Sequence, residues 1–509
     1  MSPPDFPALS RNTLKSGYPA ETGEGGAGGK LTTDGRSDTI ECDLCVLGAG
    51  SGGLSVAAAA AAFGQHVVLI EKHKMGGDCL NYGCVPSKAL IAASRRAHDI
   101  RSSAAFGIEA QEPYIDYQAL NGHVRSVIEA IAPNDSVSRF TGLGVRVITA
   151  AGHFIDRSTV AAGDYRIKAR RFVIATGSSP HVPHIPGLNG VPYFTNETIF
   201  DNRDRLEHLL IIGGGPVGIE LAQAYRRLGS RVTVFEAATA LSKDDPEMSR
   251  IVLDRLRHEG VVLHENARVE EIDSRFRNII VKLRTAAGPE TVEGTHLLIA
   301  AGRKPNIHDA GLDAAGIRYT DKGIKVNRGM RTSNRRVYAI GDVTGAPQFT
   351  HIANYHAGIV VRNALFRIPA RASANIVPWV TFTDPELAHV GLTEAMAAAK
   401  YRNIKVLRWP YRENDRAQAE RATIGHIKVI TTRSGRILGA SIVGAHAGEL
   451  IQMWSLAISQ KMNIKAMTGW ISPYPTLSEI SKRAAYKFYS NVPSSPLIRK
   501  TIGFLAKFG

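Results

Sequence analysis

The sequence contains two copies of one unit, and this repetition limits the fold more than any other feature. Each unit is a short apolar run, a glycine-rich turn, a helical segment and a second apolar run that ends in glutamate. The turns are Gly48–Gly53 and Gly213–Gly218, and the closing acids, Glu71 and Glu236, follow their first glycine at the same spacing. Such a unit predicts parallel strands joined by a helix, with glycines that let the backbone approach a pyrophosphate. We therefore expect an α/β chain with two dinucleotide-binding domains.

Several residues of these units are candidate ligands of the two dinucleotides. A carboxylate at the end of the second strand accepts a ribose 2′-hydroxyl and repels a 2′-phosphate, so Glu236 predicts NADH rather than NADPH. Glycine turns that hold no ligand are the alternative, and two matched units argue against it. The candidates from this pattern are Gly48, Gly50, Gly53 and Glu71 in the first unit, and Gly213, Gly215, Gly218 and Glu236 in the second.

Two of the four cysteines, Cys79 and Cys84, are separated by four residues and are followed by Lys88. We interpret them as a redox-active disulfide at the opening of a helix. On an ideal helix their Cα atoms would be roughly 8–9 Å apart, beyond the ~7 Å that a disulfide spans, so the bond requires an irregular turn, which Gly83 permits. Inert buried thiols are the alternative, but the preceding glycines and Lys88 indicate an exposed, electropositive setting.

The composition is that of an ordinary soluble protein. Cys42 and Cys45 lie in the apolar run before the first glycine turn, where core packing explains them better than redox chemistry does. Only four cysteines in 509 residues favour a reducing compartment over a secreted protein. We identify no signal peptide and no apolar stretch long enough to span a membrane, which predicts a cytoplasmic protein. The net charge of +16 comes with no nucleic-acid recognition motif, and no metal-ligand set is predicted.

Further motifs combine with these into a resemblance that covers about residues 40–490. The cysteine segment Gly76–Lys88 is highly specific, whereas the glycine turns alone are not. Together the motifs resemble the FAD-dependent class I pyridine nucleotide-disulfide oxidoreductases, the family of dihydrolipoamide dehydrogenases, glutathione reductases and mercuric reductases. The other matching segments are Gly48–Gly53, Ala175–Gly177, Gly213–Glu220, Gly341–Asp342, Asp384–Pro385 and Tyr474–Glu479.

The resemblance implies a homodimer in which FAD occupies the first unit and NAD(H) the second. Electrons would pass from the nicotinamide to the flavin and then to the disulfide, with Cys84 against the flavin and Cys79 attacking the substrate. Lys88 and Glu220 would pair near the flavin. The further residues implied to line the FAD site are Gly152, Thr176, Gly177 and Asp342, beside Lys88, and those implied to line the NAD site are Glu220, Glu236, Val269 and Gly302.

The expected fold is α/β, with two Rossmann-like domains for FAD and NAD and a C-terminal α+β dimerisation domain. Residues 1–39 are rich in Gly, Ser, Thr and Pro and predict a flexible arm. From about residue 372, β-rich runs with interleaved helical segments predict the separate C-terminal domain. The predicted parts are the arm (1–39), an FAD-binding domain in two pieces (40–190 and 319–371), an NAD-binding domain (191–318), a dimerisation domain (372–490) and a basic amphipathic tail (491–509).

The C-terminal motif departs from the family at one position. Disulfide reductases of the family carry His-Pro where this chain has Tyr474-Pro475, and that His, oriented by the acid that corresponds to Glu479, protonates the leaving thiolate from the partner subunit. A phenol with an ordinary pKa near 10 is a poorer proton shuttle at neutral pH than an imidazole near 6.5. Mercuric reductases have Tyr in this region but end in a cysteine pair, and this chain has no cysteine after Cys84. Tyr474 and Glu479 are candidate catalytic residues, and an aromatic interface role for Tyr474 is the alternative.

The end of the chain is cationic and amphipathic. On a helix, one face would carry apolar side chains and the others cations, which is typical of a helix that lies on a membrane surface. A tail packed on its own dimer is the alternative. The apolar side chains are Leu497, Ile498, Ile502, Leu505 and Phe508.

These observations predict an FAD-dependent oxidoreductase that passes electrons from NAD(P)H through Cys79 and Cys84 to a disulfide, Hg(II) or another thiol-reactive acceptor. The alternative is an NADH:quinone-type flavin reductase at a membrane, in which the disulfide is a sensor. A basic nucleic-acid or scaffold protein on a decayed enzyme fold is a third hypothesis, which the intact motifs disfavour.

Overall fold

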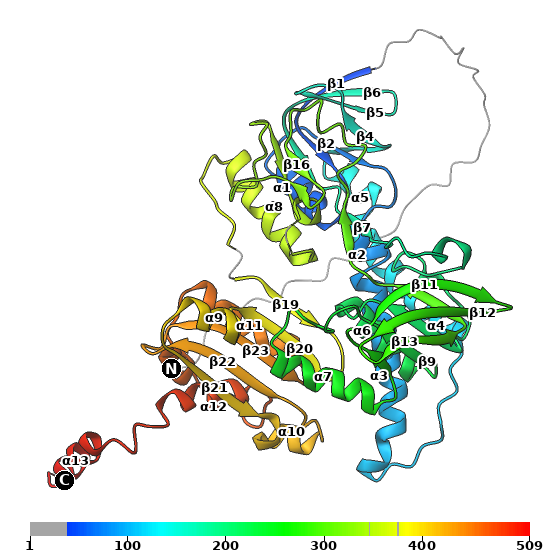
Figure 1. Cartoon of the computed structure of the whole chain (residues 1–509). Helices are drawn as coiled ribbons and strands as arrows, with labels where there is room; N and C mark the ends of the chain where they lie inside the picture. The colour runs from blue at the N-terminus through cyan, green and yellow to red at the C-terminus, as the bar shows by residue number, and fades with distance from the viewer. Residues whose placement is uncertain (1–37, 346, 374–375, 509) are drawn as a thin grey trace, which may run out of the picture.

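The structure is a computed structural model that describes residues 38–345, 347–373 and 376–508. The predicted arm of residues 1–39 lies outside the described residues except for its last two, which open strand β1. Figure 1 shows three bodies, each with its own sheet, and a C-terminal helix that projects away from them. The architecture confirms the predicted mixed α/β fold with a C-terminal α+β domain.

The first domain is built on a seven-stranded sheet. β1, β2, β3, β6 and β18 are paired in parallel, and β4 and β5 form an antiparallel extension of β6. The apolar runs around the first glycine turn become β1 and β2, which are buried where they approach the turn. The strands are β3 (Val145–Thr149), β2 (Val67–Glu71), β1 (Asp38–Leu47), β6 (Tyr165–Ile174), β5 (Thr159–Ala162), β4 (Gly152–Phe154) and β18 (Val337–Ala339).

Two helices from distant parts of the chain cover one face of this sheet. α1 (Ser51–Ala62) is the helical segment predicted after the first glycine turn, and α8 (Thr350–Ala364) packs beside it (Figure 1). Their apolar side chains share one core with β1 and β2. Because β18 and α8 follow the second domain in sequence, the first domain is assembled from two separate pieces of chain. Its smaller elements are α5 (Val137–Gly142), β7 (Ser178–Pro180), β15 (Arg303–Pro305), β16 (Tyr319–Thr320) and β17 (Gly323–Ile324).

The second domain repeats the first arrangement on a smaller scale. Its four parallel strands have the order β10-β9-β8-β14, and the second glycine turn joins β8 to α6. A three-stranded antiparallel sheet, β11-β12-β13, is attached to it. The elements are β8 (His208–Ile212), α6 (Pro216–Arg227), β9 (Arg231–Phe235), α7 (Pro246–His258), β10 (Val262–His264), β11 (Arg268–Arg275), β12 (Asn278–Thr285), β13 (Gly288–Gly294) and β14 (His296–Ile299).

The cysteine segment opens a long helix that packs against this second domain. Helix α2 (Gly77–Asn81) is followed directly by α3 (Cys84–Ser102), and α3 contacts both α4 (Tyr117–Ile131) and α6. One apolar core joins them through side chains such as Leu90 and Tyr225. The helix that begins at Cys84 is therefore held against the domain of the second glycine turn.

The C-terminal domain has a five-stranded antiparallel sheet with helices packed on it, as the β-rich texture predicts. Its core centres on Trp454, which is fully buried. The elements are β19 (Pro378–Thr381), β20 (Glu386–Gly391), α9 (Glu394–Lys400), β21 (Ile404–Pro410), α10 (Asp415–Ala419), β22 (His426–Thr432), β23 (Ile437–Gly444), α11 (Ala447–Ser459) and α12 (Glu479–Tyr486).

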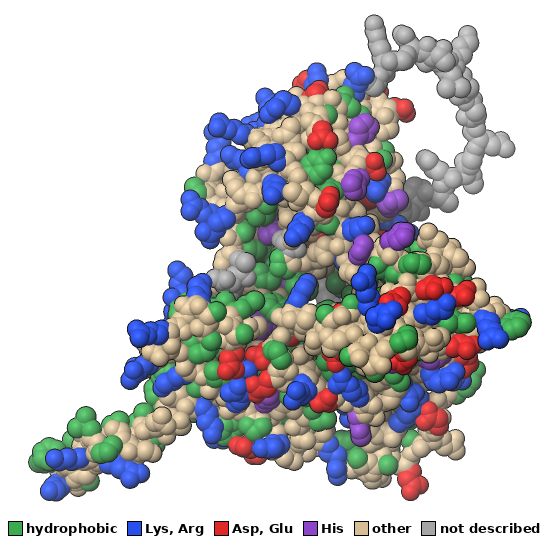
Figure 2. Space-filling view, viewed as in Figure 1, with side chains coloured by type: hydrophobic (Ala, Val, Ile, Leu, Met, Phe, Trp, Pro, Cys, Tyr) green, Lys and Arg blue, Asp and Glu red, His purple; other side chains and the backbone are tan. Residues whose placement is uncertain are grey.

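The last helix, α13 (Pro496–Leu505), extends away from the body of the molecule (Figure 1). None of its residues is buried. Figure 2 shows apolar and cationic side chains together on this extension. Among the residues that the structure describes, no helix combines the length and the apolar character needed to cross a bilayer.

Candidate functional site

The two cysteines of the central motif lie on separate helices. Cys79 is in α2 and Cys84 is the first residue of α3, with Gly83 between them in a non-helical conformation (φ −124°, ψ −111°). The structure thus contains the irregular turn that the sequence predicts. A Cβ on Gly83 would also lie 2.9 Å from a carboxylate oxygen of Asp78 and 3.1 Å from its backbone carbonyl oxygen, so the close packing favours glycine at this position.

Both cysteines are unbonded thiols in this structure, Cys79 half-buried and Cys84 exposed. A hydrogen bond from Cys79 is the main cause that lowers the pKa of Cys84 to about 6, and the charge of Lys88 acts in the same direction. The same hydrogen bond, with burial, raises the pKa of Cys79 well above the usual range of a thiol. The arrangement favours a thiolate on Cys84 and a protonated Cys79.

Thr350 is a functional candidate that the sequence reasoning missed. It is the first residue of α8, and its hydroxyl lies 3.4 Å from Cys84 Sγ although the two residues are 266 positions apart. The hydroxyl also contributes to the lowered pKa of Cys84. The pairing of β18 with β6 brings α8 to this place, and no local motif around Thr350 signals it.

The predicted partners Lys88 and Glu220 are in contact. Lys88 lies one helical turn after Cys84, and its Nζ is 2.8 Å from Glu220 Oε2 on α6. The other carboxylate oxygen of Glu220 accepts the backbone N–H of Phe382 at 2.9 Å. Lys88 Nζ also lies 4.4 Å from the centroid of the Phe382 ring, which is a favourable cation–π contact. A cation is thereby fixed close to the thiols.

The first glycine turn has the geometry of a dinucleotide cradle. A Cβ on Gly48 would collide with the Ala175 carbonyl, and one on Gly53 would collide with the Gly48 carbonyl. α1 has no side-chain cap and no acid in its first turn, so its leading N–H groups are available to an anion. The carboxylate of Glu71 is anchored beside the turn by the N–H of Ala49 at 2.6 Å. These residues fit the pyrophosphate and ribose of a dinucleotide.

The second turn repeats these contacts in detail. Gly213 and Gly218 approach backbone carbonyls in the same way, and the space next to Gly215 is open. The carboxylate of Glu236 accepts the N–H groups of Gly214 at 2.7 Å and Ala238 at 2.9 Å. In both units, a backbone N–H of the glycine turn therefore donates to the glutamate at the end of the second strand.

The other predicted FAD ligands gather at the carboxyl ends of β6 and β18. Thr176 and Gly177 follow β6, and Asp342 follows β18, its strand neighbour. Ser178 donates to the Asp342 carboxylate at 2.6 Å, and burial raises the pKa of Asp342. Gly152 is the first residue of β4, at the edge of the same sheet. A Cβ at this position would lie 3.0 Å from the Ile70 side chain of β2.

In the second domain, Gly302 follows β14 next to the glycine turn of β8, and its φ of +102° is a conformation that favours glycine. Val269 lies in β11 of the attached antiparallel sheet. Both positions are on the domain that carries the second turn, as the resemblance implies.

Tyr474 and Glu479 do not contact each other through their polar groups as the family pattern suggests. The Tyr474 hydroxyl donates to the Asp415 carboxylate at 2.9 Å, and this bond raises the pKa of the phenol. Glu479 opens α12 and faces Arg483 at 4.0 Å. Tyr474 is 70% exposed on the C-terminal domain. Asp415 is thus the carboxylate partner of this phenol, and the sequence reasoning did not identify it.

Comparison with known proteins gives a consistent result. Residues 42–357 match the family described as pyridine nucleotide-disulphide oxidoreductase, and residues 377–485 match its dimerisation domain. A mercuric reductase of Streptomyces lividans is 34% identical over 463 residues, which cover 88% of this chain and 97% of the relative. A dihydrolipoyl dehydrogenase of Bacillus subtilis is 34% identical over 457 residues, which cover 88% and 96%.

Two solved structures have the same fold. LpdA from Mycobacterium tuberculosis superposes with a TM-score of 0.81 at 26% identity, covering 87% of this chain and 99% of that one. The Cu(II) complex of the HOCl-induced flavoprotein disulfide reductase RclA from Escherichia coli gives a TM-score of 0.78 at 27% identity, with coverages of 87% and 99%.

Proposed function

Because the chain belongs to the pyridine nucleotide-disulphide oxidoreductase family, we propose that Cys79 and Cys84 are the dithiol through which it passes electrons to its acceptor. The chain is an FAD-dependent oxidoreductase that uses a nicotinamide dinucleotide, as its family is. The observation that carries the proposal is the thiol pair itself, in which Cys79, Thr350 and Lys88 together lower the pKa of Cys84.

The residues of the first domain fit FAD. The first glycine turn and the N-terminus of α1 would hold the pyrophosphate, Glu71 the ribose and Asp342 the ribityl chain. FAD, when bound, supplies a carrier that takes two electrons from the nicotinamide and passes them on to the disulfide. Lys88, held by Glu220, provides positive charge beside the thiols.

The chain's own thiols would then perform the exchange with an acceptor disulfide. Cys79 first gives its proton to the neighbouring Cys84 thiolate. The Cys79 thiolate then attacks one acceptor sulfur, forms a mixed disulfide and releases the other acceptor sulfur as a thiolate, which takes the proton from Cys84. The Cys84 thiolate next attacks Cys79 Sγ, which releases the second acceptor thiol and restores the Cys79–Cys84 bond. A low pKa on Cys84 keeps it ready as the second nucleophile, and the same pair of sulfurs can ligate a thiol-reactive acceptor such as Hg(II).

NADH is the proposed dinucleotide of the second domain. The Glu236 carboxylate is fixed at the end of β9 by two backbone N–H groups, where it can accept a 2′-hydroxyl and would repel a 2′-phosphate. A comparison of NADH with NADPH oxidation tests this choice, and equal or higher kcat/KM with NADPH would contradict it.

A dimerisation domain is part of the chain, and we propose a homodimer as the functional form. Its C-terminal domain exposes Ile471 and Tyr474, which are 90% and 70% accessible in the single chain. Tyr474 would face the partner's thiols, either as a proton donor or as an interface aromatic. With its pKa raised by Asp415, the phenol stays protonated at neutral pH.

The experiment that tests the function uses purified, FAD-loaded protein with NADH against lipoamide, glutathione disulfide, Hg(II) and quinones. We expect turnover of a thiol-reactive acceptor and a long-wavelength thiolate-to-flavin absorbance band after two-electron reduction. The variants Cys79→Ser and Cys84→Ala should lose the turnover, and Cys84→Ala should also lose the band. Full quinone turnover in Cys79→Ser, with no reduction of the other acceptors by wild type, would instead establish the quinone reductase with a sensor disulfide.

The tail supports a further proposal, peripheral contact with anionic membranes. No residue of helix α13 is buried, and most of its apolar side chains are more than half exposed in the single chain: Leu497, Ile502, Phe504 and Leu505. Arg499, Lys500 and Lys507 are the charged residues of this segment, and it has no acid (Figure 2). Apolar area combined with cations binds anionic lipid surfaces.

Truncation after Pro496 tests the membrane contact. Full-length protein should sediment with vesicles that contain phosphatidylserine and much less with neutral phosphatidylcholine vesicles, and the truncated chain should remain in solution with both. Unchanged sedimentation of the truncated chain would overturn the proposal. A truncated chain that only dissociates into monomers would show that the tail packs on the dimer instead.

A further inference from the structure

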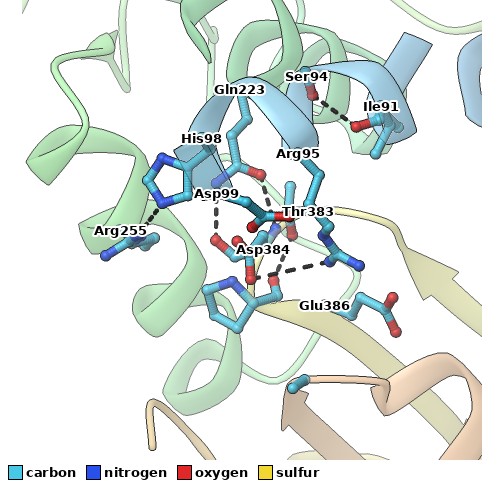
Figure 3. A network of polar contacts seen from close by, with 12 residues as sticks. Ile91, Ser94, Arg95, His98, Asp99, Gln223, Arg255, Thr383, Asp384 and Glu386 are labelled. Atoms are coloured by element: carbon cyan, nitrogen blue, oxygen red, sulfur yellow. Dashed lines mark hydrogen bonds and ion pairs between the residues drawn. The ribbon is translucent and has the colours of Figure 1, made fainter. Parts of the chain in front are cut away.

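Helix α6 presents a polar stripe on the face that meets the segment Phe382–Asp384. Glu220, Gln223 and Arg227 are three and four positions apart, so their side chains follow one side of the helix. Gln223 makes two reciprocal bonds with Asp384, because its carbonyl accepts the Asp384 N–H and its amide donates to the Asp384 carbonyl, both at 2.8 Å. Figure 3 shows this pair of contacts.

The first and last residues of the stripe, Glu220 and Arg227, also form hydrogen bonds with the segment. At one end, Glu220 accepts the Phe382 N–H at 2.9 Å, and at the other, Arg227 donates to the Asp384 carboxylate at 2.8 Å. Arg227 is only 4% exposed and is held in turn by a forked bond to Glu259. Three successive contacts therefore fix the segment along α6.

Helix α3 also contacts this segment. Lys88 packs on the Phe382 ring. Arg95, seven positions later on the same face of α3, lies 4.0 Å from the Asp384 carboxylate, and Figure 3 shows this ion pair. Burial alone would raise the pKa of Asp384, but the charges of Arg227 and Arg95 outweigh it and lower the pKa. Residues 382–384, called the wedge below, thus contact both the helix that begins at Cys84 and the helix that begins at the second glycine turn.

The wedge controls the surroundings of Lys88. The Lys88 ammonium contacts the Glu220 carboxylate and the Phe382 ring, besides a longer bond to the Ser87 hydroxyl at 3.4 Å, and the Phe382 N–H fixes the same carboxylate. If the segment moved away from α6, the Glu220 carboxylate would lose the hydrogen bond from the Phe382 N–H. Lys88 would lose its cation–π contact with the Phe382 ring. The ammonium would then be free to turn toward water and away from Cys84.

We propose that Gln223 and Asp384 are positioning residues that keep the Lys88 charge close to the thiols by clamping residues 382–384 between α3 and α6. The proposal rests on the proposed function only in that Cys84 must work as a thiolate beside the flavin. Neither residue touches a reacting atom, since both act through Phe382 and Glu220 on Lys88.

The test measures how readily Cys84 ionises in the reduced holoenzyme. The thiolate-to-flavin absorbance is followed against pH after two-electron reduction, and its midpoint reports the pKa of Cys84. Gln223→Leu, which keeps the bulk and removes both bonds to Asp384, should raise the midpoint by about 0.5–1 pH units, a part of the one to three units that an adjacent opposite charge supplies. Asp384→Asn, which keeps the shape and removes the charge, should raise it less.

The decisive comparison is made with Lys88→Gln. If Gln223 acts through Lys88, Gln223→Leu should cause no further shift in that background, because the two effects are coupled. Trp379→Phe is the matched control, since it removes another bond between the domains, from the indole N–H to Asp244 at 2.7 Å, and it should leave the midpoint unchanged.

An unchanged midpoint in both Gln223→Leu and Asp384→Asn at wild-type flavin content overturns the inference. So does a shift that persists in full in the Lys88→Gln background, because the effect would then not pass through Lys88. Absence of the absorbance band in wild-type protein is a different failure, and it would refute the proposed function itself.

Discussion

Thr350→Val removes the hydroxyl that lies 3.4 Å from Cys84 Sγ and leaves a side chain of nearly the same size at the start of α8. Thr350 lies in no motif of the sequence, so its effect tests the site geometry alone. We expect the variant to fold normally and to raise the pKa of Cys84, because the thiolate loses a hydrogen-bond donor and the neutral thiol loses little.

The size of the effect follows from the type of bond. Hydrogen bonds to charged groups contribute about 1.5–3 kcal/mol, and the bond to Cys84 is long, so the lower figure applies. With about 1.4 kcal/mol per pKa unit, the pKa should rise by about one unit. Since the pKa of Cys84 is about 6 in the wild type, it should be about 7 in the variant. At pH 7 the thiolate fraction would fall from roughly nine-tenths to roughly one half.

The measurement is the pH dependence of the thiolate-to-flavin absorbance in the reduced holoenzyme. Thr350→Ser is the matched control, because it keeps a hydroxyl at the same atom and should restore most of the wild-type midpoint. Equal midpoints for Thr350→Val and wild type would refute the reasoning, as would a valine effect that serine does not reverse.

Three other changes give sharp expectations. Gly53→Ala should lower the amount of flavin that copurifies, measured by absorbance, because the new Cβ would collide with the Gly48 carbonyl, whereas Gly122→Ala has open space in α4 and should retain full flavin. Glu236→Gln should narrow the preference for NADH by about tenfold in kcat/KM, and an unchanged preference would show that this carboxylate does not select the dinucleotide. Arg227→Met should destabilise the fold by about 3 kcal/mol in urea titration, because the buried Glu259 carboxylate and the partly exposed Asp384 carboxylate lose their common partner, and a change below about 1 kcal/mol would contradict this.

The sequence was sufficient to predict the parts of the fold that depend on local sequence patterns. Glycine spacing and apolar runs predicted the β1–α1–β2 and β8–α6–β9 units, and the structure places Glu71 and Glu236 at equivalent positions in them. The cysteine segment also predicted an irregular turn, and Gly83 lies in it with a non-helical backbone conformation. Short-range sterics determine these features, so a short stretch of sequence reveals them.

Local sequence patterns did not predict the contacts between segments that are distant in the sequence. Thr350 meets Cys84 only because β18 joins the sheet of the first domain, and Asp415 meets Tyr474 through the packing of the C-terminal domain. Asp384 was visible as part of a family motif, but its partners on α3 and α6 follow from how three bodies pack together. Such contacts depend on the whole fold.

Because the first domain is split in sequence, it is completed late during synthesis on the ribosome. β18 and α8 complete its sheet and its helical layer, yet the chain reaches them only after the whole of β8–β14 has been made. The second domain can therefore fold as a finished unit while the first is still open, since domains fold as units during synthesis. Thr350 can contact Cys84 only after α8 has been synthesised and has packed on the first domain. A nascent chain that stops before α8 would carry both cysteines without the Thr350 hydroxyl beside Cys84.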